Sequence, residues 1–161
     1  MDIDLQQFCS TDGTRWYLTK PFSMGEFSFA TNGHILVRQP RRADVPDIDA
    51  KAPKFDPSRV LDGMGLARFY APRFHLPAAP DGHVSCPERR MSVSIAGVCF
   101  ALNYVRQMLA LPGIEIANTA SGVIADRKPM LFQFDRGGVG ALMALHSPWA
   151  DHFDIEQGGA S

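Results

Sequence analysis

The residues whose types could bind a metal are few and lie far apart in the sequence. His83 and Cys86 form one closely spaced pair, and His75 precedes them in the same stretch. Zinc takes three or four nitrogen or sulfur ligands, and structural sites are built from closely spaced pairs. Because no second pair accompanies His83-x-x-Cys86, exposed loop residues are the better interpretation, and we predict no metal and no cofactor.

Nucleophilic catalysis needs a serine or cysteine beside a base that a third group orients. Cys9 near Asp12, with His34 brought close by folding, is the one arrangement the sequence offers. The chain has no G-x-S-x-G motif and no cysteine-protease signature, and Cys9 and Cys99 are more typical of small packing residues. We therefore predict no catalytic residues and a protein that is not an enzyme.

The charge of the chain limits how it can meet nucleic acid. Sixteen Lys and Arg residues against seventeen Asp and Glu residues give a net charge of −1, which excludes binding through bulk charge. Much of the positive charge falls between residues 41 and 90, so a local positive surface and a mixed solvated surface both stay open. The candidate DNA contacts are Arg59, Arg68 and Arg106.

The remaining composition describes an ordinary globular protein. Hydrophobic residues make up 45% of the 161 residues, enough for the core of one domain. No apolar run approaches the ~20 residues of a membrane span, so we expect no membrane partner. Three cysteines without a C-x-x-C motif favour a reducing compartment, which predicts a cytoplasmic location.

The first 40 residues predict a short helix and a hairpin. Residues 4–8 are the helical candidate, and a turn follows at residues 11–14. Residues 26–30 and 35–38 are apolar runs on either side of Thr31-Asn32-Gly33-His34. Asn-Gly between two apolar runs is a strong hairpin signal because both residues tolerate a positive φ.

Residues 41–90 predict a mostly irregular insertion, because most of the chain's twelve prolines lie there. One helix is expected within it, with Asp56 as N-cap, Pro57 at the first helical position and Ser58 to Leu61 following.

Residues 91–146 predict a strand, a helix and further strands. Residues 91–95 alternate as a strand, and residues 97–111 place their apolar side chains on one helical face before Pro112-Gly113. The strands expected after the helix are residues 114–117, 123–125 with 130–134, and 140–145, with a turn at residues 135–138. We expect residues 147–161 to be a flexible tail.

A short pattern occurs twice in the chain. Phe27-x-Phe29-x-x-x-Gly33 and Phe132-x-Phe134-x-x-Gly137 each precede an apolar strand. Both match a strand, a tight turn and a second strand, which suggests two related half-modules sharing one sheet surface.

Two segments resemble the bacterial DNA sliding clamp, the processivity factor of the replicative polymerase. Residues 29–36, Phe-Ala-Thr-Asn-Gly-His-Ile-Leu, resemble the A-T-D-G-H-R-L strand and turn of that family. Residues 93–145 resemble the closing half of a clamp domain and end in Leu142-Met143-Ala144-Leu145, where the family has a V-M-P-M-like end. Short phage and prophage proteins carry a similar A-T-N-G-H-I-L-V-R stretch.

The resemblance implies a fold and a binding site. The fold is α+β, with clamp-like β-α-β-β-β halves, a mostly antiparallel sheet and helices on one face. In the family the helices line a ring around duplex DNA, and a hydrophobic pocket takes linear motifs of polymerases and other partners. The matching pocket positions are Thr31, Gly33, His34, Leu36, Met143 and Leu145. Asn32, Ile35 and Ala144 depart from the family's Asp, Arg and Pro.

These observations predict one clamp-like domain over residues 1–146, followed by the tail. The predicted function is that of a phage- or prophage-type DNA-replication accessory factor, which binds DNA, a replication protein or both. The alternative is a clamp-fold protein that binds and inhibits a host protein of defence or replication. Duplex DNA and a second copy of the chain are further candidate partners.

Overall fold

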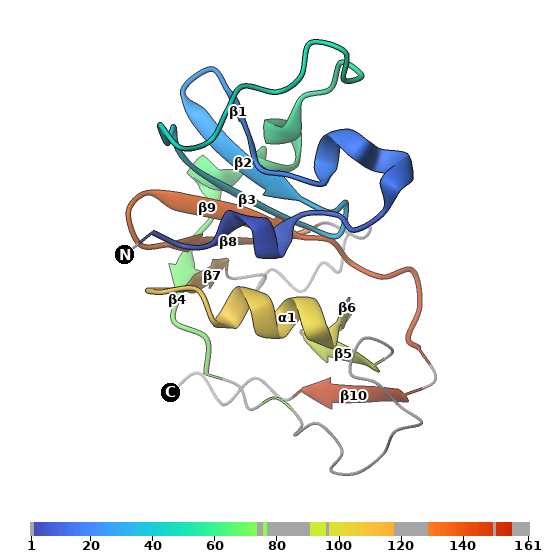
Figure 1. Cartoon of the computed structure of the whole chain (residues 1–161). Coiled ribbons are helices and arrows are strands. Elements are labelled where there is room, and N and C mark those ends of the chain that lie inside the picture. The colour runs from blue at the N-terminus through green and yellow to red at the C-terminus, as the bar shows by residue number, and fades with distance from the viewer. Residues whose placement is uncertain are drawn as a thin grey trace.

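The computed structural model describes residues 2–73, 76, 91–95, 97–117, 129–149 and 151–155, with only the backbone of residues 151 and 153–155 (Figure 1). Two β-sheets and one α-helix are combined with four short 3-10 helices in this part of the chain. The predicted α+β class, mostly antiparallel sheet with few helices, is confirmed. Among the described residues, no helix has the length and apolar character needed to cross a bilayer.

The larger sheet has seven strands in the order β1-β2-β3-β9-β8-β7-β4, and every neighbouring pair is antiparallel. Its strands are β1 (Phe22–Met24), β2 (Phe27–Thr31), β3 (Ile35–Pro40), β4 (Phe69–Tyr70), β7 (Glu115–Ala117), β8 (Met130–Phe134) and β9 (Gly138–Leu142). The predicted hairpin is β2–β3, and the second copy of the sequence pattern is β8–β9. The two hairpins meet at the β3–β9 pair, so they share one sheet.

The smaller sheet has three strands, β10 (Asp151–Ile155), β5 (Met91–Ile95) and β6 (Val98–Ala101), in that order. β10 pairs with β5 in parallel. The expectation of a flexible tail is therefore wrong for residues 151–155. The segment pairs with the edge of β5 through backbone hydrogen bonds. The composition of residues 151–155 does not by itself predict a strand.

Three of the five helices in the described part of the chain begin where an aspartate side chain caps them. Asp4, Asp12 and Asp56 each accept a hydrogen bond from a backbone N–H in the first turn of the following helix. The helices are η1 (Leu5–Phe8), η2 (Gly13–Leu18), η3 (Pro57–Leu61), η4 (Met64–Leu66) and α1 (Leu102–Leu109). The helices expected at residues 4–8 and 57–61 are present as 3-10 turns, whereas η2 was expected only as a turn.

The predicted helix over residues 97–111 is correct only in its second part. Gly97 has a φ of 82°, which turns the chain back on β5, and residues 98–101 pair with β5 as strand β6. The apolar side chains of Val98 and Phe100 suit both a strand and a helix, and pairing with β5 decides between them. α1 begins only at Leu102.

The two faces of the larger sheet pack against different material (Figure 1). The face that packs against α1 and η1, called here the helix face, forms a core shared with the smaller sheet. Its largest fully buried side chains include Phe8, Ile35, Phe100, Leu102, Met108, Phe132 and Leu142. The opposite face, called here the loop face, packs against η2, η3 and residues 48–64 through Leu18, Phe22, Phe29, Leu36 and Leu61. Helices therefore lie on both faces, not on one face as expected.

Where it is described, the predicted insertion at residues 41–90 is irregular apart from three short elements, η3, η4 and β4. Its first part covers the loop face of the sheet. The predicted strand at residues 123–125 lies outside the described residues.

Candidate functional site

The turn between β2 and β3 is fixed by its own side chains. The Thr31 hydroxyl donates to the carbonyl oxygen of Ile35 at 2.8 Å and accepts from the N–H of Gly33 at 3.1 Å. The side-chain oxygen of Asn32 accepts from the N–H groups of His34 at 2.8 Å and Ile35 at 3.1 Å. Asn and Asp side chains both accept such hydrogen bonds, so either residue can hold a turn of this kind.

Glycine is favoured at position 33 by its backbone conformation, and a side chain there would also displace Arg15. Its φ is 89°, a left-handed conformation that side chains disfavour. A Cβ atom at this position would also collide with Nη1 of Arg15, which lies against the turn. The turn is therefore a close contact between β2–β3 and η2, with the guanidinium group of Arg15 against Gly33.

The end of β9 closes on the same turn. The N–H of Met143 donates to the carbonyl oxygen of His34 at 2.8 Å, and the N–H of Leu145 donates to the carbonyl oxygen of Cys99 at 2.8 Å. β9 itself ends at Leu142, so the predicted strand over residues 140–145 is three residues too long at its end. The side chains of Met143 and Leu145 consequently face cavities instead of following the sheet pattern.

Two cavities adjoin at Met143, and together they include every partner-binding residue expected from the sequence. The first, called here the apolar cavity, has a volume of about 280 Å³. Thr31, Gly33, Leu36 and Met143 line it. The second, called here the mixed cavity, has a volume of about 340 Å³, and His34, Met143 and Leu145 line it.

Sequence reasoning missed the outer wall of the apolar cavity. This wall consists of Tyr17 and Leu18 of η2 and of Phe55, Pro57 and Val60 in and before η3. The proline-rich insertion therefore supplies four of the eleven residues that line the pocket, namely Phe55, Asp56, Pro57 and Val60. The sequence signal for this outer wall is a short capped helix with apolar residues. Phe55 precedes the cap Asp56, and Val60-Leu61 is an apolar pair within the helix.

The mixed cavity lies between the turn and the first residues of α1. It is lined by His34, Ala101, Asn103, Tyr104, Met143, Leu145 and Trp149. The rings of His34 and Tyr104 stack with their centroids 5.3 Å apart and their planes 12° from parallel. The side-chain oxygen of Asn103 is buried and has no hydrogen-bond partner among the described residues.

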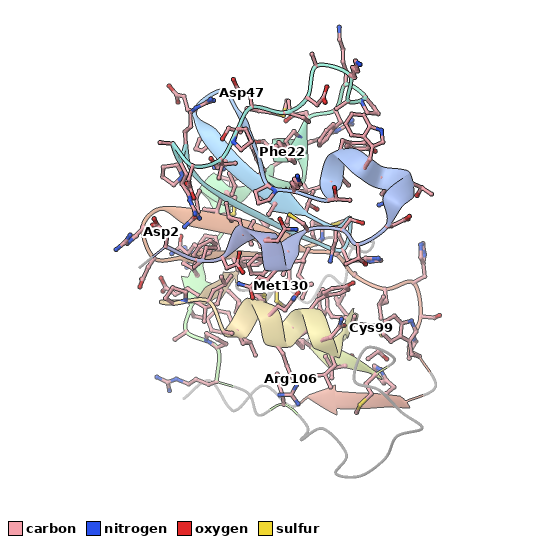
Figure 2. The ribbon with its side chains drawn as sticks, viewed as in Figure 1. Asp2, Phe22, Asp47, Cys99, Arg106 and Met130 are labelled. Carbon is pink, nitrogen blue, oxygen red and sulfur yellow. The ribbon has the colours of Figure 1, made fainter. Side chains whose placement is uncertain are left out.

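The three arginines expected to contact DNA do not share one surface. Arg59 lies on η3, over the loop face of the sheet. Arg106 lies on α1, on the opposite side of the sheet, and Figure 2 shows it pointing away from the seven strands. Arg68 lies between η4 and β4 and is exposed. The larger sheet separates Arg59 from Arg106, and the DNA contacts expected of the three arginines stay a prediction.

The candidate nucleophile is placed unfavourably for catalysis. Cys9 is buried in the core of the helix face, and burial, with a smaller effect of Asp4, raises the pKa of its thiol to about 11. A thiol is a poor nucleophile at neutral pH when its pKa lies so high. His34 is engaged elsewhere, in the stack with Tyr104.

Metal binding gains no support from the described residues. Within them, no group of three or more His, Cys, Asp and Glu side chains could hold an ion. The sequence candidates His75, His83 and Cys86 lie outside the part of the chain that the structure describes.

Comparison of the chain with protein-family models, with curated proteins and with solved structures finds no match. The function is therefore inferred from the residues of the chain and their geometry.

Proposed function

We propose that this protein is a non-enzymatic, clamp-like accessory factor of phage or prophage DNA replication, and that it acts by binding a replication protein. The partner inserts apolar side chains of an extended segment into the apolar cavity. The observation that carries the proposal is the convergence of the Thr31–Leu36 turn with Met143 around that cavity, together with the sequence resemblance of both segments to the sliding clamp.

The order of elements supports a clamp-like architecture. β6, α1, β7, β8 and β9 follow each other as β-α-β-β-β, the unit from which clamp domains are built. In the N-terminal part, two 3-10 helices, η1 and η2, precede the three strands β1, β2 and β3, without a first strand. The two sets of three strands meet at β3–β9, and η1 and α1 pack into the same core.

The chemistry of the apolar cavity supports a protein ligand. Its walls are almost entirely apolar, and an aromatic pair, Tyr17 and Phe55, lies 5.8 Å apart between ring centroids on its outer side. Pockets of this kind anchor the few large apolar side chains that dominate protein interfaces. A methionine in the wall adapts to different side chains.

Encirclement of DNA receives less support than partner binding. Every side chain of α1 is at least half-buried, whereas a helix that faces DNA presents exposed basic residues. This observation favours a second candidate function: the same cavity binds a host protein of defence or replication and inhibits it. Both candidates use the same site and differ in the identity of the partner.

The test is a binding measurement with the protein and fluorescent peptides from the apolar segments of replication proteins of the host. Val60→Asp places a charge in the wall of the apolar cavity and should reduce affinity at least about tenfold, while Val139→Asp, on the same face but outside the cavity, is the matched control. Equal binding by Val60→Asp and the unaltered protein would overturn the proposal.

The absolute mass in solution distinguishes a clamp that forms a ring from a protein that only binds a partner. Light scattering on a sizing column over a tenfold concentration range should give a closed oligomer if the protein forms a ring. A monomer that still binds peptides leaves partner binding in place and removes encirclement.

A further inference from the structure

The outer wall of the apolar cavity continues to the surface of the chain through one aromatic side chain. Among the described residues, Trp16 and Leu66 are the two large apolar side chains that are exposed, at 47% and 93%. The ring of Trp16 stands edge-on to the ring of Tyr17, with the centroids 5.8 Å apart. Tyr17 lines the cavity, so Trp16 lies directly beside the cavity wall. Leu66 lies on η4 and lines neither of the two cavities.

Trp16 rests on a row of rings that ends in the core. Tyr17 contacts Phe55 with 5.8 Å between the ring centroids, and Phe55 contacts Phe22 at the same distance. Phe22 is buried in the core of the loop face. A tryptophan ring provides a large contact area and loses little conformational entropy when a partner packs on it. The exposed part of Trp16 is therefore a suitable surface for a second apolar side chain of the partner.

The residue before Trp16 brings a positive charge to the edge of the same cavity. The guanidinium group of Arg15 lies against Gly33, which lines the cavity. The backbone of η2 departs from helical geometry at Arg15, where φ is −106° and ψ is 54°. Arg15 and Trp16 consequently lie against different parts of the cavity lining, Gly33 and Tyr17.

The carboxylates near Arg15 are bound by other groups. Arg15 is exposed and forms no hydrogen bond or ion pair with the described part of the chain. The carboxylate of Asp12 accepts from the N–H and the hydroxyl of Thr14 at 2.9 and 2.8 Å, and these bonds lower the pKa of Asp12 more than the charge of Arg15 does. Asp56, in the cavity lining, accepts from the N–H of Ser58 at 3.0 Å. The charge of Arg15 therefore favours a partner that brings its own carboxylate.

We infer that Trp16 and Arg15 extend the binding site of the apolar cavity, and that the partner presents an extended segment that is acidic as well as apolar. One apolar side chain of this segment enters the cavity, and a second packs on the exposed part of Trp16. A carboxylate of the segment pairs with Arg15. The inference rests on the proposed function, because it assigns further contacts to the same protein partner.

The first test follows the fluorescence of Trp16. The probe is the tightest-binding peptide of the set that tests the apolar cavity, used without its label. Trp149→Phe leaves Trp16 as the sole tryptophan of the chain. Saturating peptide should shift the emission of Trp16 to shorter wavelength, because a packed side chain removes water from the ring. Unchanged emission while the labelled peptide binds the same variant would overturn the inference.

The second test compares the two exposed apolar residues. Trp16→Ala should weaken peptide binding at least about fivefold, because tryptophan is a frequent anchor of protein interfaces. Leu66→Ala removes the more exposed side chain, away from the cavities, and should bind as the unaltered protein does. Chemical denaturation of both variants distinguishes a loss of binding from a loss of stability. The emission of Trp16 remains informative if Trp16→Ala alters the fold.

The third test concerns the charge. Arg15→Gln should weaken binding about two- to fivefold at low salt and less at high salt, as expected for an exposed ion pair. Changing the acidic residue of the peptide to its amide should weaken binding by the unaltered protein and have no further effect on Arg15→Gln. Arg73→Gln, at another exposed arginine that lines neither cavity, is the matched control.

The outcomes distinguish this inference from the proposed function. Absence of peptide binding, or equal binding by Val60→Asp and the unaltered protein, contradicts the proposed function and the inference with it. Binding that Val60→Asp weakens, but that Trp16→Ala and Arg15→Gln leave unchanged, overturns the inference alone and confines the site to the cavity. A tightest-binding peptide without an acidic residue overturns it as well.

Discussion

The two faces of the larger sheet are built in different ways, and the difference explains where the cavities lie. On the helix face, α1 and η1 present side chains at regular spacing, and Phe8, Met108 and Phe132 are fully buried. On the loop face, short 3-10 turns and proline-rich chain cover the sheet, and aromatic rings such as Tyr17 and Phe55 remain half-buried. The loop face therefore keeps the apolar cavity under its cover, whereas the helix face has a close-packed core with the mixed cavity only at the beginning of α1.

The comparison shows that the close-packed core and the apolar cavity lie on opposite faces of the sheet. A regular helix fits the surface of a sheet closely and leaves few voids. Proline lacks an N–H donor and interrupts regular structure, so the insertion follows the sheet with gaps. The edge of the loop face, beside the Thr31–Leu36 turn, is the place where such a gap is lined by apolar side chains.

The largest expected effect contrasts one phenylalanine from each face. Phe132→Ala should lower the free energy of unfolding by about 3–5 kcal/mol, because its side chain is fully buried on the helix face. Phe55→Ala should cost less than about 2 kcal/mol, because Phe55 is half-buried in the cavity wall. Chemical denaturation measures both values. Equal losses would show that the faces do not differ in this way.

Gly33→Ala should have the next largest effect on stability. The positive φ of 89° disfavours a side chain, so we expect a loss of about 1–3 kcal/mol in the free energy of unfolding. Adding Arg15→Ala should recover the part that comes from the collision with Arg15. Gly13→Ala, where a Cβ atom meets open space, is the control and should be nearly neutral. An unchanged midpoint in Gly33→Ala would contradict the turn geometry.

Asn32→Ala should cost about 1 kcal/mol, because its side chain accepts hydrogen bonds from two N–H groups of the turn. Asn32→Asp keeps the oxygen that accepts both hydrogen bonds and should retain the stability. Hydrogen exchange at the amides of His34 and Ile35 gives a local measurement. Slow exchange in the Ala variant would show that the backbone alone holds the turn.

The smallest expected effect is the pH dependence that Cys9, buried on the helix face, gives to the free energy of unfolding. Burial raises the pKa of Cys9 from 9.0 to about 11 in the folded chain, so the folded state holds this proton more tightly than the unfolded state. The resulting stabilisation is complete below pH 9 and declines as the pH rises toward 11. Denaturation at pH 8 and pH 10 should show a smaller loss in Cys9→Ala than in the unaltered protein. The same loss in both would exclude a role for the thiol.

Local signals in the sequence correctly predicted the elements that depend on neighbouring residues. Asn32-Gly33 sets the β2–β3 turn, because a positive φ and a side-chain acceptor are properties of those residues alone. Asp4 and Asp56 cap helices through contacts within the same turn. The six residues expected at the partner site also come together, because the turn and the end of β9 meet through the β3–β9 pair.

Elements that depend on distant residues were not predictable. Val98 to Ala101 form a strand only because β5 lies beside them, and β10 forms only on the other edge of β5. Arg59 and Arg106 are separated by the sheet, which no spacing along the chain indicates.

The sequence by itself determined the turn, the helix caps and the alternation that gives each strand of the larger sheet its two faces, because these follow from side-chain and backbone preferences over a few residues. The tertiary structure alone decided that the insertion covers one of those faces and that Tyr17, Phe55 and Val60 complete the apolar cavity. The physical reason is that apolar side chains gain free energy from burial against any complementary surface, and only the folded chain determines which surface that is.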